Sequence, residues 1–190
     1  MAGSIKLHGG EEVPGLDGAN VADFWSWAYS NLQENTTRSL FAEYIVGHLL
    51  GALGSGRVEW DAVDLRFGDK TVEVKSAAYV QSWQQERLSR ISFDIGRKKA
   101  WDARSNTMNH NPCRSADCYV FCLYPEKNRE LADPLDVPAW RFYVMATPEI
   151  DEHFGDQKSV SLSRLRELVI DVDFRGLRDR VGSVGQSAGI

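Results

Sequence analysis

Apolar and polar residues alternate on both sides of a Gly-Asp pair in the stretch AVDLRFGDKTVEVKSA, residues 62–77. A period of two is typical of β-strands, and a two-residue turn that begins with glycine commonly joins two antiparallel strands. We therefore predict a hairpin with strands at 57–67 and 70–77 and a turn at Gly68 and Asp69. The pairing that follows from this turn decides which side chains share a face.

The predicted register separates apolar from charged side chains. Successive side chains of a strand point to opposite faces, so Leu65 and Val72 lie together on an apolar face. On the other face, Asp64 lies directly opposite Glu73, and Lys75 is the diagonal neighbour of Asp64. Two carboxylates directly opposite each other repel and destabilise a sheet. A solvated hairpin would more comfortably place lysine opposite glutamate, so the pattern calls for a second explanation.

Hydrophobic periodicity and turn residues predict further elements around the hairpin. Helices are expected at 21–35, 38–53, 96–105 and 161–170, strands at 91–95, 118–124 and 140–147, and a polar loop at 104–117. Thr36 or Thr37 is expected to cap the second helix, which is apolar nearly all round. The aromatic residues of the first helix are expected in the core. This order favours an α/β fold in which helices flank one mixed sheet.

Length and composition agree with one globular domain. The 190 residues are 43% hydrophobic and 26% charged, as is typical of soluble proteins. We expect a mobile N-terminal arm over 1–20, one domain over 21–180 and a flexible tail over 181–190. The sequence has no apolar run of membrane-spanning length and no secretory leader pattern. An odd number of cysteines, three, argues for the reducing cytoplasm.

The net charge of −5 is not that of a protein that holds nucleic acid by bulk charge. Any such binding must use a local patch or a partner subunit. One candidate patch is the segment 84–104, which has six Lys or Arg residues against three Asp or Glu. Within it, Arg97, Lys98 and Lys99 are the candidate nucleic-acid contacts. The competing interpretation of such a run is an ordinary solvated helical face.

A divalent cation would turn the repulsion between Asp64 and Glu73 into attraction. Mg²⁺ prefers hard oxygen ligands and often takes one or two carboxylates together with water and substrate phosphate. Lys75 beside that cation would orient an attacking water, help to deprotonate it, or offset the charge of a phosphoryl transition state. The competing interpretation is a set of screened surface ion pairs. The pattern itself is short, and DQK at 156–158 also fits it, although that copy has no strand signal.

Glu43 is the single charged residue between Ser39 and Gly56 and lies inside the apolar second helix. An unpaired ionised carboxylate is very costly to bury, so Glu43 must be neutralised or partnered. One interpretation is a salt bridge to an arginine such as Arg38 or Arg66. The other is that Glu43 is a third acid beside the hairpin, which binds the metal directly or through water.

A helix with Glu43, a strand with Asp64 and a partner strand with Glu73-Val74-Lys75 together resemble the PD-(D/E)XK nuclease superfamily. This resemblance implies a restriction-endonuclease-like fold with an αβββαβ core, which element order places over residues 38–124. It implies that Asp64 and Glu73 bind Mg²⁺ or Mn²⁺, that Glu43 is the helix acid, and that Lys75 positions the water.

Some positions depart from the family pattern. Val63 stands where the family name has proline, and the gap between Asp64 and Glu73 is short. The downstream Gln-x-x-x-Tyr of the RecB-like branch is missing, because Gln81 and Gln85 have no matching tyrosine. These departures leave open both the branch and the choice between endonuclease and exonuclease.

The resulting hypothesis is a metal-dependent nuclease that hydrolyses phosphodiester bonds of DNA, with RNA as a second possible substrate, in restriction, defence or repair. A homodimer or a partner subunit is compatible with that role. The alternative hypothesis is a non-catalytic nucleic-acid-binding or structural subunit with the same fold. A third is an unrelated α/β protein whose hairpin charges are merely solvated.

Zinc chemistry is disfavoured. The spacing of His110, Cys113, Cys118 and Cys122 matches no common zinc ribbon or finger, and two of these thiols fall on one face of a predicted strand. Buried core thiols are the simpler interpretation. The sequence also lacks a phosphate-binding glycine loop and the common signatures of a serine or cysteine nucleophile.

Overall fold

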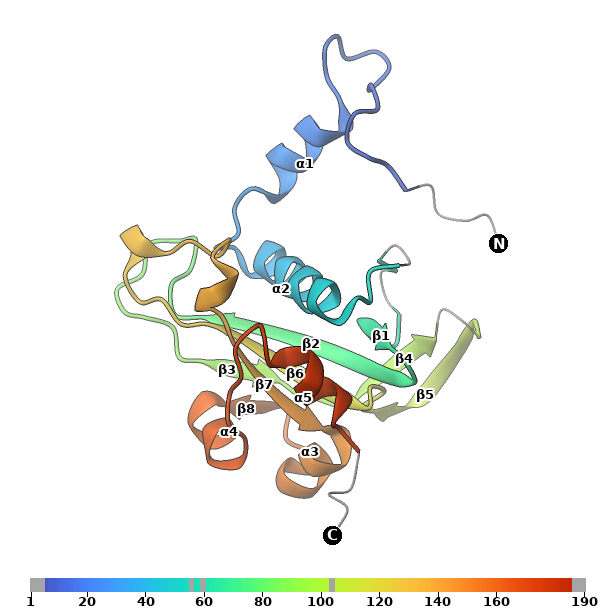
Figure 1. Cartoon of the computed structure of the whole chain (residues 1–190), viewed down its shortest axis with the longest axis vertical. Coiled ribbons are helices and arrows are strands. Elements are labelled where there is room, and N and C mark those ends of the chain that lie inside the picture. Colours follow the sequence, from blue (N-terminus) through green and yellow to red (C-terminus); the bar gives the residue numbers. More distant parts are fainter. Residues whose placement is uncertain (1–5, 55–56, 59–60, 103–104, 186–190) are drawn as a thin grey trace.

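The computed structural model describes residues 6–54, 57–58, 61–102 and 105–185 (Figure 1). A four-stranded mixed sheet with the order β1-β2-β6-β7 forms its centre. The strands are β1 (Leu65–Phe67), β2 (Lys70–Ala78), β6 (Cys118–Tyr124) and β7 (Arg141–Ala146). β2 runs parallel to β6, and the two outer pairs are antiparallel. The expectation of an α/β domain with a mixed sheet is therefore confirmed.

The hairpin has the register that its sequence predicts. Phe67 pairs with Lys70 and Leu65 with Val72. Gly68 has a φ of +61°, a conformation that glycine adopts without the steric cost of a Cβ atom. The first strand is much shorter than expected, because β1 begins only at Leu65. This short strand leaves most of β2 without a partner on that side within the described chain.

Helices and a small second sheet cover the two faces of the central sheet (Figure 1). The first face packs against α2 (Asn35–Leu50) and α5 (Leu177–Gly182). The other face packs against β3 (Ser92–Asp94), β8 (Ser159–Ser161), α3 (Thr147–Phe154) and α4 (Leu162–Leu168). β3 and β8 pair with each other rather than with the central sheet. All seven residues of β6 are buried because they lie between these two layers.

The limits of the second helix differ from the expected ones. α2 begins at Asn35, and its N-cap residue Glu34 makes no side-chain capping hydrogen bond, so neither expected threonine caps it. It ends at Gly51, which adopts the left-handed conformation with a φ of +70° and donates to two carbonyls of the last turn. Tyr44 is exposed, so the helix is buried along one side rather than all round.

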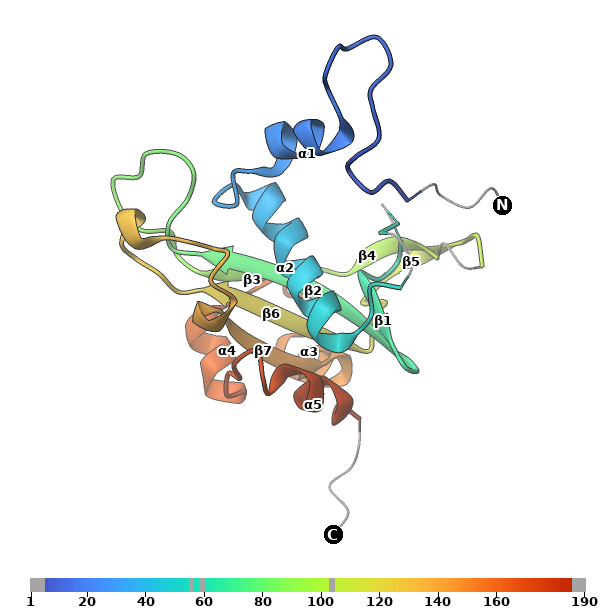
Figure 2. The ribbon, with the colours of Figure 1, turned by 45° about the horizontal axis from the view of Figure 1, so that its top comes forward.

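The helix expected at 96–105 and the loop expected at 104–117 are both wrong. Instead, β4 (Lys98–Asp102) and β5 (Thr107–Cys113) form a separate antiparallel hairpin. Six of the seven residues of β5 are exposed, so no apolar alternation marks it as a strand. Figures 1 and 2 show this hairpin at the end of the molecule next to β1.

The first helix forms but does not enter the core. α1 (Val21–Tyr29) begins with a capping box, in which Asn20 and Asp23 each accept a hydrogen bond from the other's backbone amide. None of its residues is buried, and Trp27 is 84% exposed. The expectation that its aromatic residues are core residues is therefore wrong. In both ribbon views α1 stands apart from the sheet (Figures 1 and 2).

The C-terminal part of the chain contains both expected and unexpected elements. The helix expected at 161–170 forms as α4, and Ser161 caps it by accepting a hydrogen bond from the Arg164 amide. The polar connection after β6 contains the two short 3-10 helices Arg129–Leu131 and Val137–Ala139. α3, β8 and α5 were not expected. Val181 in α5 is fully buried, so the packed chain continues past 180.

None of the helices within the described residues is both long enough and apolar enough to cross a membrane. At the N-terminal side, backbone hydrogen bonds join Val13 to Ala19 and Val21 to Glu11. The arm over 1–20 and the tail over 181–190 extend into 1–5 and 186–190, which lie outside the described residues. The mobility of both segments stays a prediction.

Candidate active site at the free edge of β2

The free edge of β2 begins where β1 ends, and Asp64 lies beside it. The last paired residue of β2 on this side is Val72. Two residues further on, the Val74 amide donates a hydrogen bond to Oδ2 of Asp64 at 2.7 Å. The carboxylate thus takes the place of the strand carbonyl that would continue the ladder. This contact fixes Asp64 against β2 and gives it a structural role as well as a charge.

Glu73 and Lys75 form an ion pair on the same face of β2. Their side chains are only 18% and 20% exposed. Burial raises the pKa of Glu73, and the negative charge of Asp64 raises it further, although Lys75 opposes both effects. The two carboxylates therefore repel each other, as the sequence pattern suggested.

Lys75 is held in its charged form. Burial lowers the pKa of its ammonium group, but the carboxylates of Glu73, Asp64 and Asp94 outweigh burial, and the pKa lies above its usual value. A lysine with a raised pKa is a poor base near neutral pH. Of the roles considered for Lys75, orientation of water and compensation of negative charge therefore fit better than proton abstraction.

Glu43 projects from α2 toward this edge and pairs with Arg57 rather than with either arginine named from the sequence. Oε2 of Glu43 lies 3.0 Å from Nε of Arg57. Arg38 is five positions away on the helix, about 140° around its axis, and donates to Gln81 instead. Arg66 pairs with Asp61 at 3.3 Å. The suggested bridges to Arg38 and Arg66 are therefore replaced by one to Arg57.

Electrostatics link Glu43 to the hairpin acids. Burial raises the pKa of Glu43, the bond from Arg57 lowers it, and the charges of Asp64 and Glu73 raise it again, with a net rise. Glu43 also lines an open cleft of about 480 Å³ together with Asp64 and Lys75. α2 and the hairpin thus bring the helix acid and the hairpin charges to one surface.

A second cleft of about 340 Å³ continues the first on the side of Glu73. The two clefts share three lining residues, Asp64, Lys75 and Asp94. All four residues predicted for the site therefore line one or both of two adjoining clefts. They come from α2, from the turn before β1 and from β2.

Sequence reasoning gave no role to Arg57 and Asp94, which are charged residues of these clefts. Asp94 accepts a hydrogen bond from the Gly96 amide at 2.9 Å and pairs with Lys98 at 2.6 Å. Its signal was present, because it is the polar position between two apolar residues of a predicted strand. Arg57 is the first residue of the strand expected at 57–67, and no sequence pattern singles it out.

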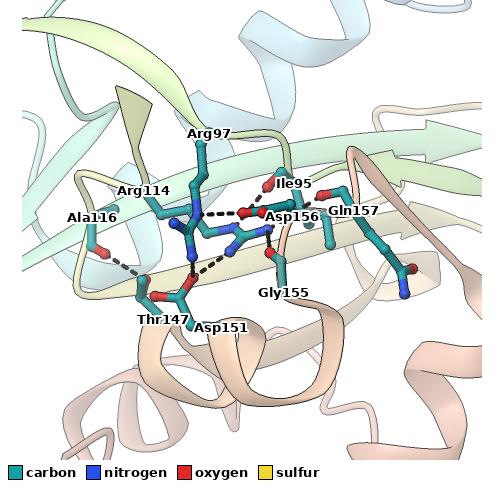
Figure 3. Close-up of polar contacts among 9 residues, drawn as sticks. All are labelled: Ile95, Arg97, Arg114, Ala116, Thr147, Asp151, Gly155, Asp156 and Gln157. Atoms are coloured by element: carbon teal, nitrogen blue, oxygen red, sulfur yellow. Dashed lines mark hydrogen bonds and ion pairs between the residues drawn. The ribbon is translucent and has the colours of Figure 1, made fainter. Parts of the chain in front are cut away.

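The three basic residues named as nucleic-acid contacts have different surroundings. Arg97 pairs with Asp151 at 3.0 Å and with Asp156 at 3.5 Å, in the cluster that Figure 3 shows. Lys98 pairs with Asp94, and Lys98 and Lys99 both line the second cleft. The guanidinium group of Arg97 is thus engaged within the protein, whereas the two lysines lie beside the site. Nucleic-acid contact by all three stays a prediction.

The side chains of the site suit a hard divalent cation only if their present ion pairs open. Asp64, Glu73 and Glu43 supply carboxylate oxygens, and Val74 offers a main-chain carbonyl. Within the ranges that the structure describes, however, no three acidic, histidine or cysteine side chains are grouped closely enough to hold an ion. Glu73 is engaged by Lys75 and Glu43 by Arg57. Metal binding would require at least Glu73 to exchange its lysine partner for the cation.

Two of the three cysteines lie outside the site, whereas Cys113 lines the second cleft. Cys118 and Cys122 are buried in β6, and burial raises the pKa of both thiols. This confirms that they are core residues. All three thiols are free, and Cys113 is only partly buried.

The raised pKa of Glu43 gives a test of the charge cluster. The folded protein binds a proton at Glu43 more readily than the unfolded chain, so this group lowers stability as pH rises above its usual pKa of 4.5. Glutamine does not ionise, so we expect Glu43→Gln to raise the melting temperature near pH 7. The gain should disappear as pH falls below about 4.5, where Glu43 is protonated in both states.

Thermal unfolding of both proteins from about pH 4 to about pH 8 measures this difference. The lost pair with Arg57 has an exposed partner and contributes at most about 1 kcal/mol. If the variant is less stable than the wild type at pH 7, the ion pair with Arg57 stabilises the protein more than burial and repulsion of the Glu43 charge destabilise it. That result would contradict our interpretation.

No protein-family model matches the sequence, and a comparison with curated proteins finds no match.

Proposed function

We propose that this protein is a metal-dependent nuclease that hydrolyses phosphodiester bonds. The observation that carries the proposal is the convergence of Glu43, Asp64, Glu73 and Lys75 on two adjoining clefts at the free edge of β2. Acids that repel each other destabilise the protein. Clusters of charges with shifted pKa values are concentrated at functional sites, where they take part in the chemistry.

The fold that we propose is a reduced variant of the restriction-endonuclease-like core. The support is a helix that packs on a hairpin, followed by a strand parallel to β2. One part of the expected αβββαβ order is missing within the described residues, because the β4–β5 hairpin stands where the second core helix would be. β3 also pairs with β8 instead of joining the central sheet. The proposal therefore rests on the site more than on the full topology.

In this mechanism Asp64 and Glu73 would hold Mg²⁺ or Mn²⁺, and Glu43 would support the ion directly or through water. The bound cation would act as a Lewis acid and lower the pKa of an attacking water. Lys75, held charged by its acidic neighbours, orients that water and offsets the negative charge that develops on the phosphoryl group. Arg57, half exposed beside Glu43, would be able to contact a substrate phosphate.

A second candidate is a non-catalytic nucleic-acid-binding subunit with the same site remnants. The observation in its favour is that Glu43 and Glu73 each already have a basic partner. These internal pairs neutralise the charges without a metal. This candidate predicts binding without cleavage.

The test is cleavage of supercoiled plasmid, linear duplex and single strands with Mg²⁺, with Mn²⁺ or with EDTA. We expect cleavage that EDTA abolishes and that Asp64→Asn lowers at least about tenfold. Asparagine retains a side-chain oxygen that accepts from the Val74 amide, so this variant removes the charge and keeps the edge contact. Its melting temperature should therefore not fall below that of the wild type.

Cleavage that persists in EDTA would contradict the metal-dependent mechanism. If no substrate is cut in either metal, the non-catalytic candidate is favoured. Equal activity of the wild type and Asp64→Asn would remove Asp64 from the site.

A further inference from the structure

The loop between β2 and β3, residues 79–91, is closed and held by its own hydrogen bonds. At its base the Ser89 amide donates to the Tyr79 carbonyl at 3.0 Å. Inside it, the amide group of Gln85 donates to the Tyr79 carbonyl at 3.2 Å and to the Ser89 hydroxyl at 3.1 Å, and its oxygen accepts from the Gln81 amide at 2.7 Å. A loop organised in this way presents its outer side chains with little loss of conformational entropy on binding.

Gln81 and Gln85, which do not match the RecB-like pattern, thus hold the loop in place. Gln81 is buried, and its side chain donates to the Ala78 carbonyl and accepts from Arg38 on α2 at 3.2 Å. On the other side, the Arg129 guanidinium donates to the Trp83 carbonyl. The β2–β3 loop is therefore anchored both to α2 and to the segment that follows β6, and Figures 1 and 2 show it beside that segment.

The outer surface of this loop combines an aromatic ring with positive charge. Trp83 is 52% exposed, and Arg87 and Arg90 are exposed. Residues 83–90 line an open hollow of about 470 Å³. Glu86 is the single acidic residue of the loop, so the loop has a net positive charge in a chain whose net charge is −5.

The loop also adjoins the proposed active site. Its first residue, Tyr79, directly follows β2 and lies three positions after Ser76. Its last residue, Ile91, directly precedes Ser92 of β3. Ser76 and Ser92 both line the cleft that contains Asp64 and Lys75. From Lys75 to the end of β2 is three residues, or roughly 10 Å of strand. A strand of nucleic acid that lies in the cleft would reach the loop within a few nucleotides.

We propose that the β2–β3 loop binds unpaired nucleotides of the substrate, with one base stacked on Trp83 and neighbouring phosphates held by Arg87 and Arg90. This inference rests on the proposed nuclease function and specifies its substrate class as single-stranded nucleic acid, or duplex with an unpaired segment. The π-face of a base stacks on an aromatic side chain in a sequence-tolerant way. In duplex the bases are stacked on one another, so the ring gains no such contact.

The experiment measures binding by fluorescence anisotropy in EDTA, where cleavage does not interfere. The probes are labelled single-stranded DNA, single-stranded RNA and duplex DNA of the same sequence. We expect the wild type to bind a single strand more tightly than duplex and Trp83→Ala to lose roughly 5- to 100-fold in affinity for that strand. Trp83→Phe retains a ring and should retain most of the affinity. The matched control is Trp27→Ala, which removes a still more exposed tryptophan from α1 and should leave binding unchanged.

The arginines are tested through salt dependence. The double variant Arg87→Ala, Arg90→Ala should have a shallower slope of log affinity against log salt, by about 1.4 for two phosphate contacts to a single strand. The inference is overturned if Trp83→Ala binds like the wild type, if Trp27→Ala weakens binding equally, or if duplex binds as tightly as a single strand. Because these measurements need no cleavage, failure of the nuclease proposal would appear separately in the cleavage assay.

Discussion

Replacement of Lys75 by alanine is expected to lower the rate of metal-dependent cleavage by about 10²- to 10³-fold. The reason is the position of its ammonium group, which is paired with Glu73, attracted by Asp64 and Asp94, and kept charged by all three. A positive charge fixed at this point needs no reorganisation when negative charge develops on the substrate. Lys75 is not a metal ligand, so its loss should lower kcat and leave the metal concentration at half-maximal rate within a few-fold.

Two variants make this result specific. Lys158→Ala removes the lysine of the second acid-x-Lys copy, which is exposed and lines neither cleft, and should cut like the wild type. Lys75→Arg retains the charge with a different shape and should retain part of the activity. Full activity of Lys75→Ala would remove this residue from the mechanism. A loss of activity that higher metal concentration restores would instead give Lys75 a role in metal binding.

The β1–β2 hairpin could be predicted from local sequence alone. Its register follows from a two-residue turn and from alternation with a period of two, both of which are encoded within 16 residues. Because the register is fixed locally, Asp64, Glu73 and Lys75 could be placed on one face of the hairpin before any tertiary contact was known. Glu43 could be singled out for a similar reason, since it is an isolated acid in an otherwise apolar helix segment.

Other features depend on contacts that sequence does not display. The β4–β5 hairpin is mostly exposed, so neither strand has an apolar face that would reveal its period. The aromatic residues of α1 suggest a core helix by their type, yet the helix packs away from both apolar clusters. Arg57 pairs with Glu43 across 14 positions of sequence, and Asp94 lies near Lys75 because β3 packs against β2. Each of these depends on long-range packing.

Replacement of Arg114 by methionine is expected to lower the free energy of unfolding by about 3 to 5 kcal/mol. The Arg114 side chain is 0% exposed, and its guanidinium group donates to the carbonyls of Ile95 at 2.7 Å and Gly155 at 2.9 Å and to the Asp151 carboxylate (Figure 3). Methionine fills similar space without donors, so these acceptors would lose a buried partner. The melting temperature should fall by about 10 °C in a chain of this length.

Arg97→Met is the matched control, because Arg97 contacts the same Asp151 but is 41% exposed. Its exposed ion pairs should contribute no more than about 1 kcal/mol. A similar cost for both variants would mean that Asp151, rather than the buried carbonyl contacts, carries the stabilisation. Ile95 directly follows Asp94, so Arg114 also fixes the end of β3 that faces Lys75. We therefore expect Arg114→Met, measured at a temperature where it stays folded, to weaken cleavage.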